Sequence, residues 1–105
     1  MAKQILAGIE IDVDEDGFIQ EPEKWSPALA EELAKGEGAY PLSEDAWKII
    51  NYLREYYLEF ESAPPVRMIT KKTGLSLNRI YEIFSKGPAA GACKVAGLPK
   101  PTGCL

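Results

Sequence analysis

Two cysteines near the C-terminal end of the sequence, Cys93 and Cys104, are the residues whose type and spacing best suit chemistry. Ten residues separate them, among them two glycines and two prolines. A thiolate attacks a sulfur electrophile, and a second thiol within reach resolves the product by closing a bridge. We therefore expect Cys104 to be the attacking thiol and Cys93 the resolving thiol. The alternative is an accidental pair of cysteines in a tail.

Basic side chains near the two cysteines are expected to favour thiolate formation, because positive charge nearby lowers the pKa of a thiol. Lys94 and Lys100 lie between the cysteines, and Arg67 precedes them. The terminal carboxylate of Leu105 opposes a second negative charge on Cys104. We therefore expect Cys104 to be activated mainly when it is docked on a partner.

The segment that carries both cysteines differs in composition from the rest of the chain. Residues 85–105 contain four glycines and three prolines but no aromatic or acidic residue. Such a stretch has little to bury, so it is expected to form a flexible C-terminal arm after a helical domain at 1–84. Burial of either thiol is not expected. Fully extended, the last eleven residues would reach about 35 Å, which is enough to enter a cleft in a partner.

Several kinds of site are excluded by the residues that the chain lacks. It has no histidine, which rules out a Ser-His-Asp or Cys-His nucleophile pair and a mixed Cys/His zinc site. Two cysteines do not complete a four-thiolate site in a monomer. We therefore expect no metal site and no cofactor in this chain. The chemistry points to a partner protein rather than to a self-contained enzyme.

The charge and the hydropathy of the chain bound its surroundings. No apolar run approaches the roughly 20 residues that span a bilayer, so no membrane insertion is expected. The first residues become acidic too soon for a signal peptide, and a cytoplasmic location is expected. Residues 1–62 hold 5 Lys/Arg and 15 Asp/Glu, whereas residues 63–105 hold 7 Lys/Arg and one acid. The basic half could face an anionic ligand, an acidic protein or nucleic acid.

Patterns of apolar residues predict a mainly helical fold with a small N-terminal β-hairpin. Ile9, Ile11 and Val13 alternate with acidic residues, and Gly8 can turn the chain between Gln4–Ala7 and Ile9–Val13. Helix starts are predicted at Ser26, Ser43 and Ser76. The expected helices are 27–35, 44–61, 66–73 and 77–84. The apolar stripe expected to face the core on 44–61 comprises Ala46, Ile49, Ile50, Leu53, Tyr57 and Phe60.

Two further motifs suggest other functions. The spacing of Asp12, Asp14, Asp16, Gly17 and Glu23 fits a calcium-binding EF-hand loop, but the entering segment alternates like a strand. The helices at 66–73 and 77–84 have the dimensions of a helix-turn-helix. The exposed pair Asn78–Arg79 could then contact DNA, although Glu82 lies on the same short helix. A helix-turn-helix DNA-binding regulator therefore stays open as an alternative.

The cysteine segment resembles a known family. The sequence from Gly87 to Leu105, GPAAGACKVAGLPKPTGCL, looks like the C-terminal arm of DsrC proteins, the gamma subunits of dissimilatory sulfite reductase. The similarity extends along essentially the whole chain and includes 13–18, 49–57 and 65–74. TusE-like proteins of the tRNA thiolation relay belong to the wider family and generally keep only the penultimate cysteine. Having both Cys93 and Cys104 favours the DsrC interpretation.

The resemblance implies a fold and a mechanism. The fold would be a small orthogonal helical bundle with a helix-turn-helix-like pair, an N-terminal hairpin and the flexible arm. The arm would insert between the alpha and beta subunits of sulfite reductase, whose sirohaem and Fe–S clusters would do the redox chemistry. Cys104 would take up sulfite-derived sulfur, and Cys93 would close a trisulfide. A membrane-associated reductase complex would then reduce this bridge. In the relay of tRNA thiolation, the partners would be sulfurtransferases.

Overall fold

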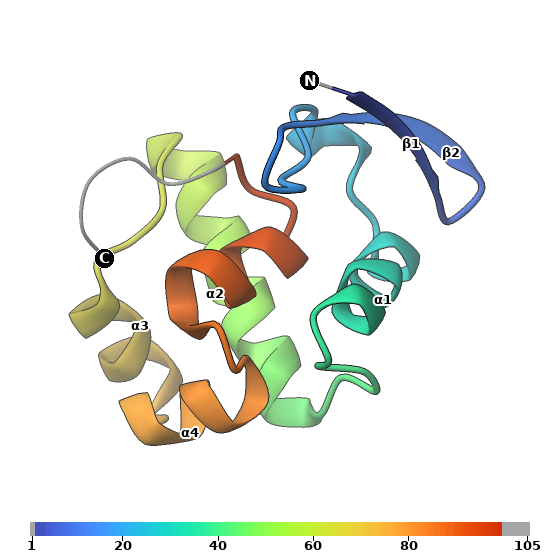
Figure 1. Ribbon diagram of the computed structural model, residues 1–105. Coiled ribbons are helices and arrows are strands. Elements are labelled where there is room, and N and C mark those ends of the chain that lie inside the picture. Colours follow the sequence, from blue (N-terminus) through green and yellow to red (C-terminus); the bar gives the residue numbers. More distant parts are fainter. Residues whose placement is uncertain (1, 100–105) are drawn as a thin grey trace.

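The computed structural model describes residues 2–99 and shows a mainly helical chain with an N-terminal hairpin, as predicted (Figure 1). Four α-helices and two short helical segments follow the hairpin. In chain order the elements are β1 (Ala2–Leu6), β2 (Ile9–Val13), η1 (Pro22–Lys24), α1 (Pro27–Gly36), α2 (Glu44–Phe60), α3 (Val66–Thr73), α4 (Leu77–Ile83) and η2 (Pro88–Cys93). Within the described residues, no helix is long and apolar enough to cross a membrane.

Serine caps start three of the helices, where the sequence predicted them. Each serine hydroxyl oxygen accepts a backbone N–H from the first turn and so satisfies one of the donors that a helix start leaves unpaired. The pairs are Ser26 with Leu29 (3.2 Å), Ser43 with Ala46 (3.2 Å) and Ser76 with Arg79 (3.1 Å). The predicted bounds of these helices agree with the observed ones to within a residue.

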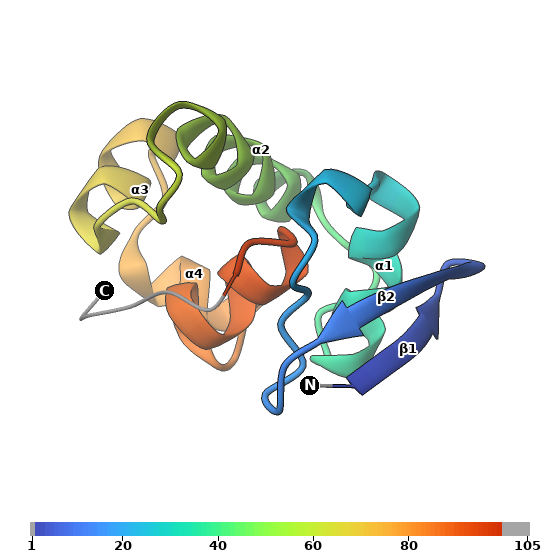
Figure 2. The ribbon, with the colours of Figure 1, turned by 90° about the horizontal axis from the view of Figure 1, so that it is seen from above.

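The hairpin β1–β2 is antiparallel, with Leu6 opposite Ile9 at the turn. Ala7 and Gly8 both take positive φ, at 51° and 79°, which is the backbone of a tight two-residue hairpin turn. Strand β1 therefore ends at Leu6, one residue before the predicted end. Ile11 and Val13 are buried, so one face of the hairpin packs on the core. Figures 1 and 2 place the hairpin on the α1 side of the molecule, away from α3.

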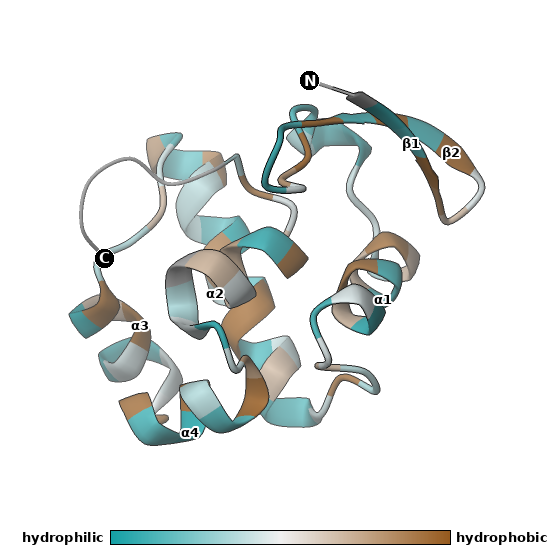
Figure 3. Cartoon of the chain, in the orientation of Figure 1, coloured by the Kyte–Doolittle hydropathy of each residue, from teal (hydrophilic) through white to brown (hydrophobic). Residues whose placement is uncertain are grey.

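Helix α2 is the longest element, and the core is built around it. Four of its predicted core positions are fully buried: Ala46, Ile49, Ile50 and Leu53. Figure 3 shows both hydrophobic and hydrophilic residues along α2. The prediction for Phe60 is wrong, since this side chain is 55% exposed. It lies in the last turn of α2, where it packs on Tyr56 with 4.5 Å between ring centroids instead of on the core.

The described part of the predicted arm contributes to the core. We call residues 88–98 the Cys93 segment; it forms η2 and the turn that follows it. Five of its residues belong to the core cluster: Ala92, Cys93, Val95, Ala96 and Leu98. The segment packs on α2, and Figures 1 and 2 show it in the middle of the molecule, between α4 and the hairpin. Residues 100–105 of the predicted arm lie outside the described residues.

Candidate functional site

Cys93 is the last residue of η2, and none of its surface is exposed. The expectation that this thiol would not be buried is wrong. Small residues let the Cys93 segment approach α2 closely, and Val95 and Leu98 supply the apolar surface that the segment buries. Cys104 and Lys100, the other predicted residues at this end of the chain, lie outside the described residues.

The backbone around Cys93 forms a π-helical turn, which is a rare structure and is frequently found at functional sites. Gly87 starts it with a φ of +86°, in the region that favours glycine. At Gly91 an added Cβ would lie 2.9 Å from the Cβ of Phe84, so this position needs glycine for close packing. The Cys93 carbonyl accepts the N–H of Leu98 at 3.1 Å. The thiol is therefore held in a closed turn.

Burial raises the pKa of the Cys93 thiol to about 12. The thiol is protonated at neutral pH in this conformation, and a protonated thiol is a poor nucleophile. The sequence prediction was that neighbouring lysines would favour the thiolate. In the structure the loss of solvation opposes it. Cys93 must leave the core, or be approached inside it, before it can react.

This pKa makes the stability of the fold depend on pH. The buried, protonated Cys93 thiol contributes its full stabilisation of the folded chain below the ordinary thiol pKa of 9.0. This contribution is lost as the pH rises towards about 12, because the thiol of the unfolded chain releases its proton first. Between about pH 8 and about pH 10, we expect wild type to lose on the order of 1 kcal/mol more stability than Cys93→Ala. Urea denaturation of both proteins measures this difference. Equal losses would mean that Cys93 titrates as an exposed thiol.

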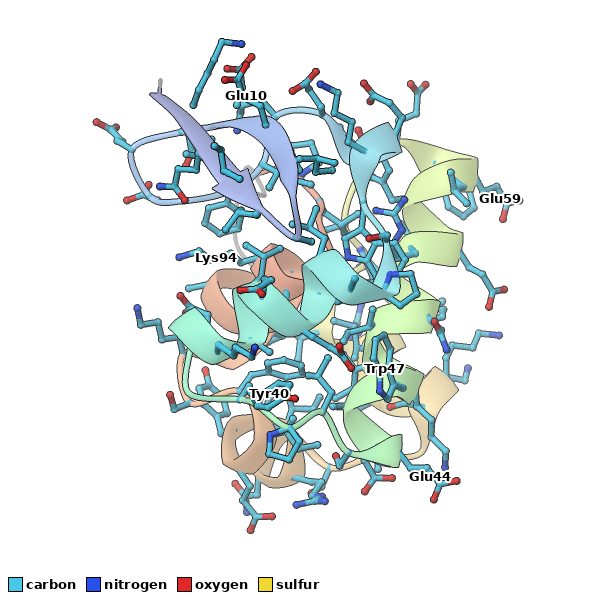
Figure 4. The ribbon with its side chains drawn as sticks, turned by 90° about the vertical axis from the view of Figure 1, so that its right-hand side faces the viewer. Glu10, Tyr40, Glu44, Trp47, Glu59 and Lys94 are labelled. Atoms are coloured by element: carbon cyan, nitrogen blue, oxygen red, sulfur yellow. The ribbon has the colours of Figure 1, made fainter. Side chains whose placement is uncertain are left out.

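Lys94 is paired with the carboxylate of Glu37, the residue that caps the C-terminal end of α1. Its Nζ lies 2.8 Å from Oε2 of Glu37, whose side chain is 6% exposed, and Lys86 approaches Oε1 of Glu37 at 3.6 Å. An added Cβ on Gly17 would lie 2.9 Å from Nζ of Lys94, so the turn at 14–17 leaves room for this ammonium group. Figure 4 shows Lys94 between the hairpin and α1. Its charge therefore serves the packing of the Cys93 segment.

Two side chains bind the backbone just after Cys93. The indole Nε1–H of Trp25 donates to the Val95 carbonyl at 3.1 Å. Arg54 donates from Nη1 to the Ala96 carbonyl at 3.0 Å and from Nη2 to the Pro22 carbonyl at 3.1 Å. The guanidinium also lies over the Trp25 ring, 4.4 Å from its centroid. We call Trp25 and Arg54 the anchor.

Sequence reasoning missed the anchor, because no motif or spacing singled out Trp25 or Arg54. The bonded residues are 70 and 42 positions apart in the chain, so no local pattern reveals the pairs. A charged residue directly after the buried Leu53 was the one signal available. Burial lowers the pKa of the Arg54 guanidinium, which fits its half-buried position. Both carbonyls that it binds gain a charged donor.

Arg67, the third predicted basic residue, is exposed on α3. Within residues 2–99, no hydrogen bond or ion pair joins its guanidinium to the Cys93 segment, and the carbonyl of Arg67 accepts the hydroxyl of Thr70 at 3.0 Å. The structure therefore brings Cys93 and Lys94 together but leaves Arg67 on another element. Its relation to Cys104 lies outside the described residues.

The α3–α4 pair has the predicted helix-turn-helix form, with Gly74 between the helices at a φ of +75°. The guanidinium that would contact DNA under the regulator alternative is occupied, however. Nε of Arg79 lies 3.2 Å from Oδ2 of Asp45, and Nη1 lies 3.2 Å from Oε1 of Glu82. These carboxylates compete with phosphate for the arginine, so the geometry gives no support to a DNA interface here.

The acidic turn that fits the EF-hand spacing has a structural role. Asp14 Oδ1 accepts the N–H groups of Asp16 and Phe18, both at 2.9 Å, and so closes the turn after β2. The entering element is a strand, as the alternation predicted, whereas an EF-hand loop is entered by a helix. In the part of the chain that the structure describes, no group of three or more His, Cys, Asp or Glu residues is placed to hold a metal ion.

Comparison with known proteins gives the same family at the level of sequence and of structure. The family model described as DsrC like protein matches residues 5–105. The chain is 46% identical over 105 residues to the dissimilatory-type sulfite reductase subunit gamma of Nitratidesulfovibrio vulgaris, and all of both chains is covered. It is 40% identical to the sulfurtransferase TusE of Salmonella typhimurium, covering 96% of this chain and 98% of that one.

The structural match is equally extensive. The oxidized gamma subunit of the dissimilatory sulfite reductase (DsrC) from Archaeoglobus fulgidus superimposes with a TM-score of 0.86 at 44% identity. The match covers 99% of this chain and 100% of that chain. The resemblance drawn from the two-cysteine segment is thereby confirmed, and the chain belongs to the DsrC-like protein family.

Proposed function

We propose that this chain is the sulfur-carrying substrate protein of a dissimilatory sulfite reductase, with Cys104 as carrier and Cys93 as resolving thiol. The observation that carries the proposal is the family match over residues 5–105, which includes both cysteines. The chain is also 46% identical to a subunit gamma along its whole length. We expect no cofactor in this chain, which has no histidine. The redox centres, sirohaem and Fe–S clusters, would then belong to the alpha and beta subunits.

The proposed reaction is two displacements at one sulfur atom. The Cys104 thiolate attacks a sulfur that has been reduced by two electrons from sulfite and still carries two hydroxyl groups. One leaves as water, which yields Cys104–S–S–OH. The Cys93 thiol displaces the second as water and closes a trisulfide. Four electrons and four protons from a membrane-associated complex then release sulfide and restore both thiols. In sulfur oxidation, the carrier would bring a persulfide to the reductase instead.

The burial of Cys93 supports an order for these steps. Its thiol is enclosed and protonated, so the first attack belongs to Cys104. The residues after Leu98 are the ones left to carry Cys104 outwards, since the Cys93 segment is packed on α2. Cys104 is six residues beyond Leu98, and six extended residues reach about 20 Å. This is shorter than the reach expected from a fully flexible arm. We propose a cytoplasmic location, which suits partners that keep the thiols reduced.

The experiment that tests the proposal is intact-protein mass spectrometry during turnover with sulfite and a dissimilatory sulfite reductase. We expect the wild-type chain to gain one sulfur atom and lose two hydrogens, as a trisulfide requires. A parallel sample without sulfite should keep its original mass. If the mass stays unchanged while the reductase turns over, the chain is not a carrier in this reaction.

The relation to TusE supports a second candidate, a sulfur relay in tRNA thiolation with sulfurtransferases as partners. That relay would need a persulfide on Cys104 and no bridge to Cys93. Incubation with a persulfide-loaded sulfurtransferase distinguishes the two. Loading from the sulfurtransferase but not from sulfite turnover would favour the relay.

A further inference from the structure

The anchor fixes the backbone immediately after Cys93. Trp25 binds the Val95 carbonyl, and Arg54 binds the Ala96 carbonyl, two and three residues beyond the thiol. Through Pro22, the same guanidinium also holds the loop before α1. Gly97 closes the arrangement, because an added Cβ there would lie 2.3 Å from Cδ1 of Trp25. The Trp25 and Arg54 side chains therefore join the Cys93 segment, the loop before α1 and helix α2.

This arrangement controls access to the thiol. Cys93 is fully buried, and its carbonyl is bonded to Leu98, which lies beyond the anchored carbonyls. The turn that hides the thiol is therefore closed on its C-terminal side by the anchor. Local opening of this turn requires the bonds from Trp25 and Arg54 to break first. Lys94, directly after Cys93, is held in addition by its ion pair with Glu37.

We propose that Trp25 and Arg54 are positioning residues that keep the Cys93 thiol inaccessible while Cys104 carries sulfur, and that their release from Val95 and Ala96 admits the resolving step. The role in sulfur transfer rests on the proposed function. The control of thiol access does not, because it follows from the contacts alone. This control delays the attack of the Cys93 thiol on Cys104 while Cys104 carries sulfur.

The chemical reason for such timing is a side reaction. If sulfur is held on Cys104 as a persulfide, an accessible Cys93 thiolate attacks the Cys104 sulfur. The new bond is the Cys93–Cys104 disulfide, and the terminal sulfur leaves as hydrosulfide with its electron pair. No external oxidant is needed, because the persulfide supplies the oxidising equivalent. A buried Cys93 prevents this loss until the carrier reaches its partner.

The first test measures access to Cys93 in a Cys104→Ala background, which leaves one thiol. N-ethylmaleimide is added to the folded protein, and the modified fraction is followed by intact mass. Arg54→Met removes both charged hydrogen bonds but keeps an unbranched side chain. We expect it to raise the labelling rate by on the order of 10- to 100-fold. Trp25→Phe removes one neutral donor, and we expect about fivefold. We expect the labelling rate of Arg54→Lys to lie between those of the Cys104→Ala parent and Arg54→Met, because a single ammonium group replaces a guanidinium that binds two carbonyls.

A control separates local opening from general destabilisation. Arg79→Met also removes two ionic contacts. One of them is with Asp45 at the start of α2, nine residues before Arg54. This is about 13 Å along the helix. We expect Arg79→Met to leave labelling unchanged. In Arg54→Met, labelling should depend on urea much more weakly than global unfolding does. Labelling at the parental rate, or with the urea dependence of global unfolding, would overturn the proposal.

The second test connects access to sulfur transfer. The chain with both cysteines is loaded on Cys104 with a persulfide donor, and the lifetime of the loaded mass is compared between wild type and Arg54→Met. We expect a shorter lifetime in the variant, with hydrosulfide released and the disulfide formed. An equal lifetime despite faster labelling would refute the timing role. If wild type never accepts sulfur but labelling follows the anchor, then the proposed function fails and the control of access stands.

Discussion

Replacing Cys104 with alanine is expected to abolish sulfur loading, with a loss of more than a hundredfold in the loaded fraction. Cys104 would be the only thiol free to make the first attack, because Cys93 is buried and its pKa is raised to about 12. The measurement is the mass of the chain after turnover with sulfite and a dissimilatory sulfite reductase. In Cys104→Ala, we expect no added sulfur.

Cys93→Ala is the matched control for this prediction. It should still load sulfur on Cys104, but the product should stay a linear adduct that a reductant removes without passing through an internal bridge. The truncation also leaves a small cavity in the core, so its stability must be measured beside its mass. If Cys104→Ala loads as well as wild type, the assignment of the two roles is wrong. If Cys93→Ala fails to load while it remains folded, Cys93 takes part in the first attack.

Gly97→Ala is expected to destabilise the fold by about 1–3 kcal/mol more than Gly74→Ala does. Both glycines have a φ of +75°, so both substitutions share the cost of an alanine in the left-handed region, about 1–2 kcal/mol. The surroundings differ. The added Cβ would lie 2.3 Å from Cδ1 of Trp25 at position 97, whereas nothing lies within 4 Å at position 74.

The comparison of these two glycines isolates the close approach of the Cys93 segment to Trp25. Urea denaturation followed by tryptophan fluorescence gives the free energy of unfolding of each variant. Labelling of Cys93 in the folded state should be faster in Gly97→Ala than in Gly74→Ala, because the clash acts on the anchored turn. Equal loss of stability in the two variants would show that the Trp25 ring moves aside, and that the contact does not hold the segment.

The local signals in this chain were sufficient for most of the secondary structure. Serine caps at three helix starts, a glycine at the end of α3 and the alternation in β2 each act within a few residues. Such signals depend on backbone donors and conformations that the adjacent side chains supply. Phe60 shows their limit. Its helical spacing predicted burial, but burial depends on whether another element covers that turn.

Residue types and their spacing define the chemistry that is available: two thiols, no histidine, and the family pattern from Gly87 to Leu105. The packing of distant segments against one another buries Cys93, pairs Lys94 with Glu37, and brings Trp25 and Arg54 to the backbone that follows the thiol. Composition indicated a segment with little to bury. Its small residues instead allow tight packing on α2, and contacts between positions 42 to 70 apart leave no local trace in the sequence.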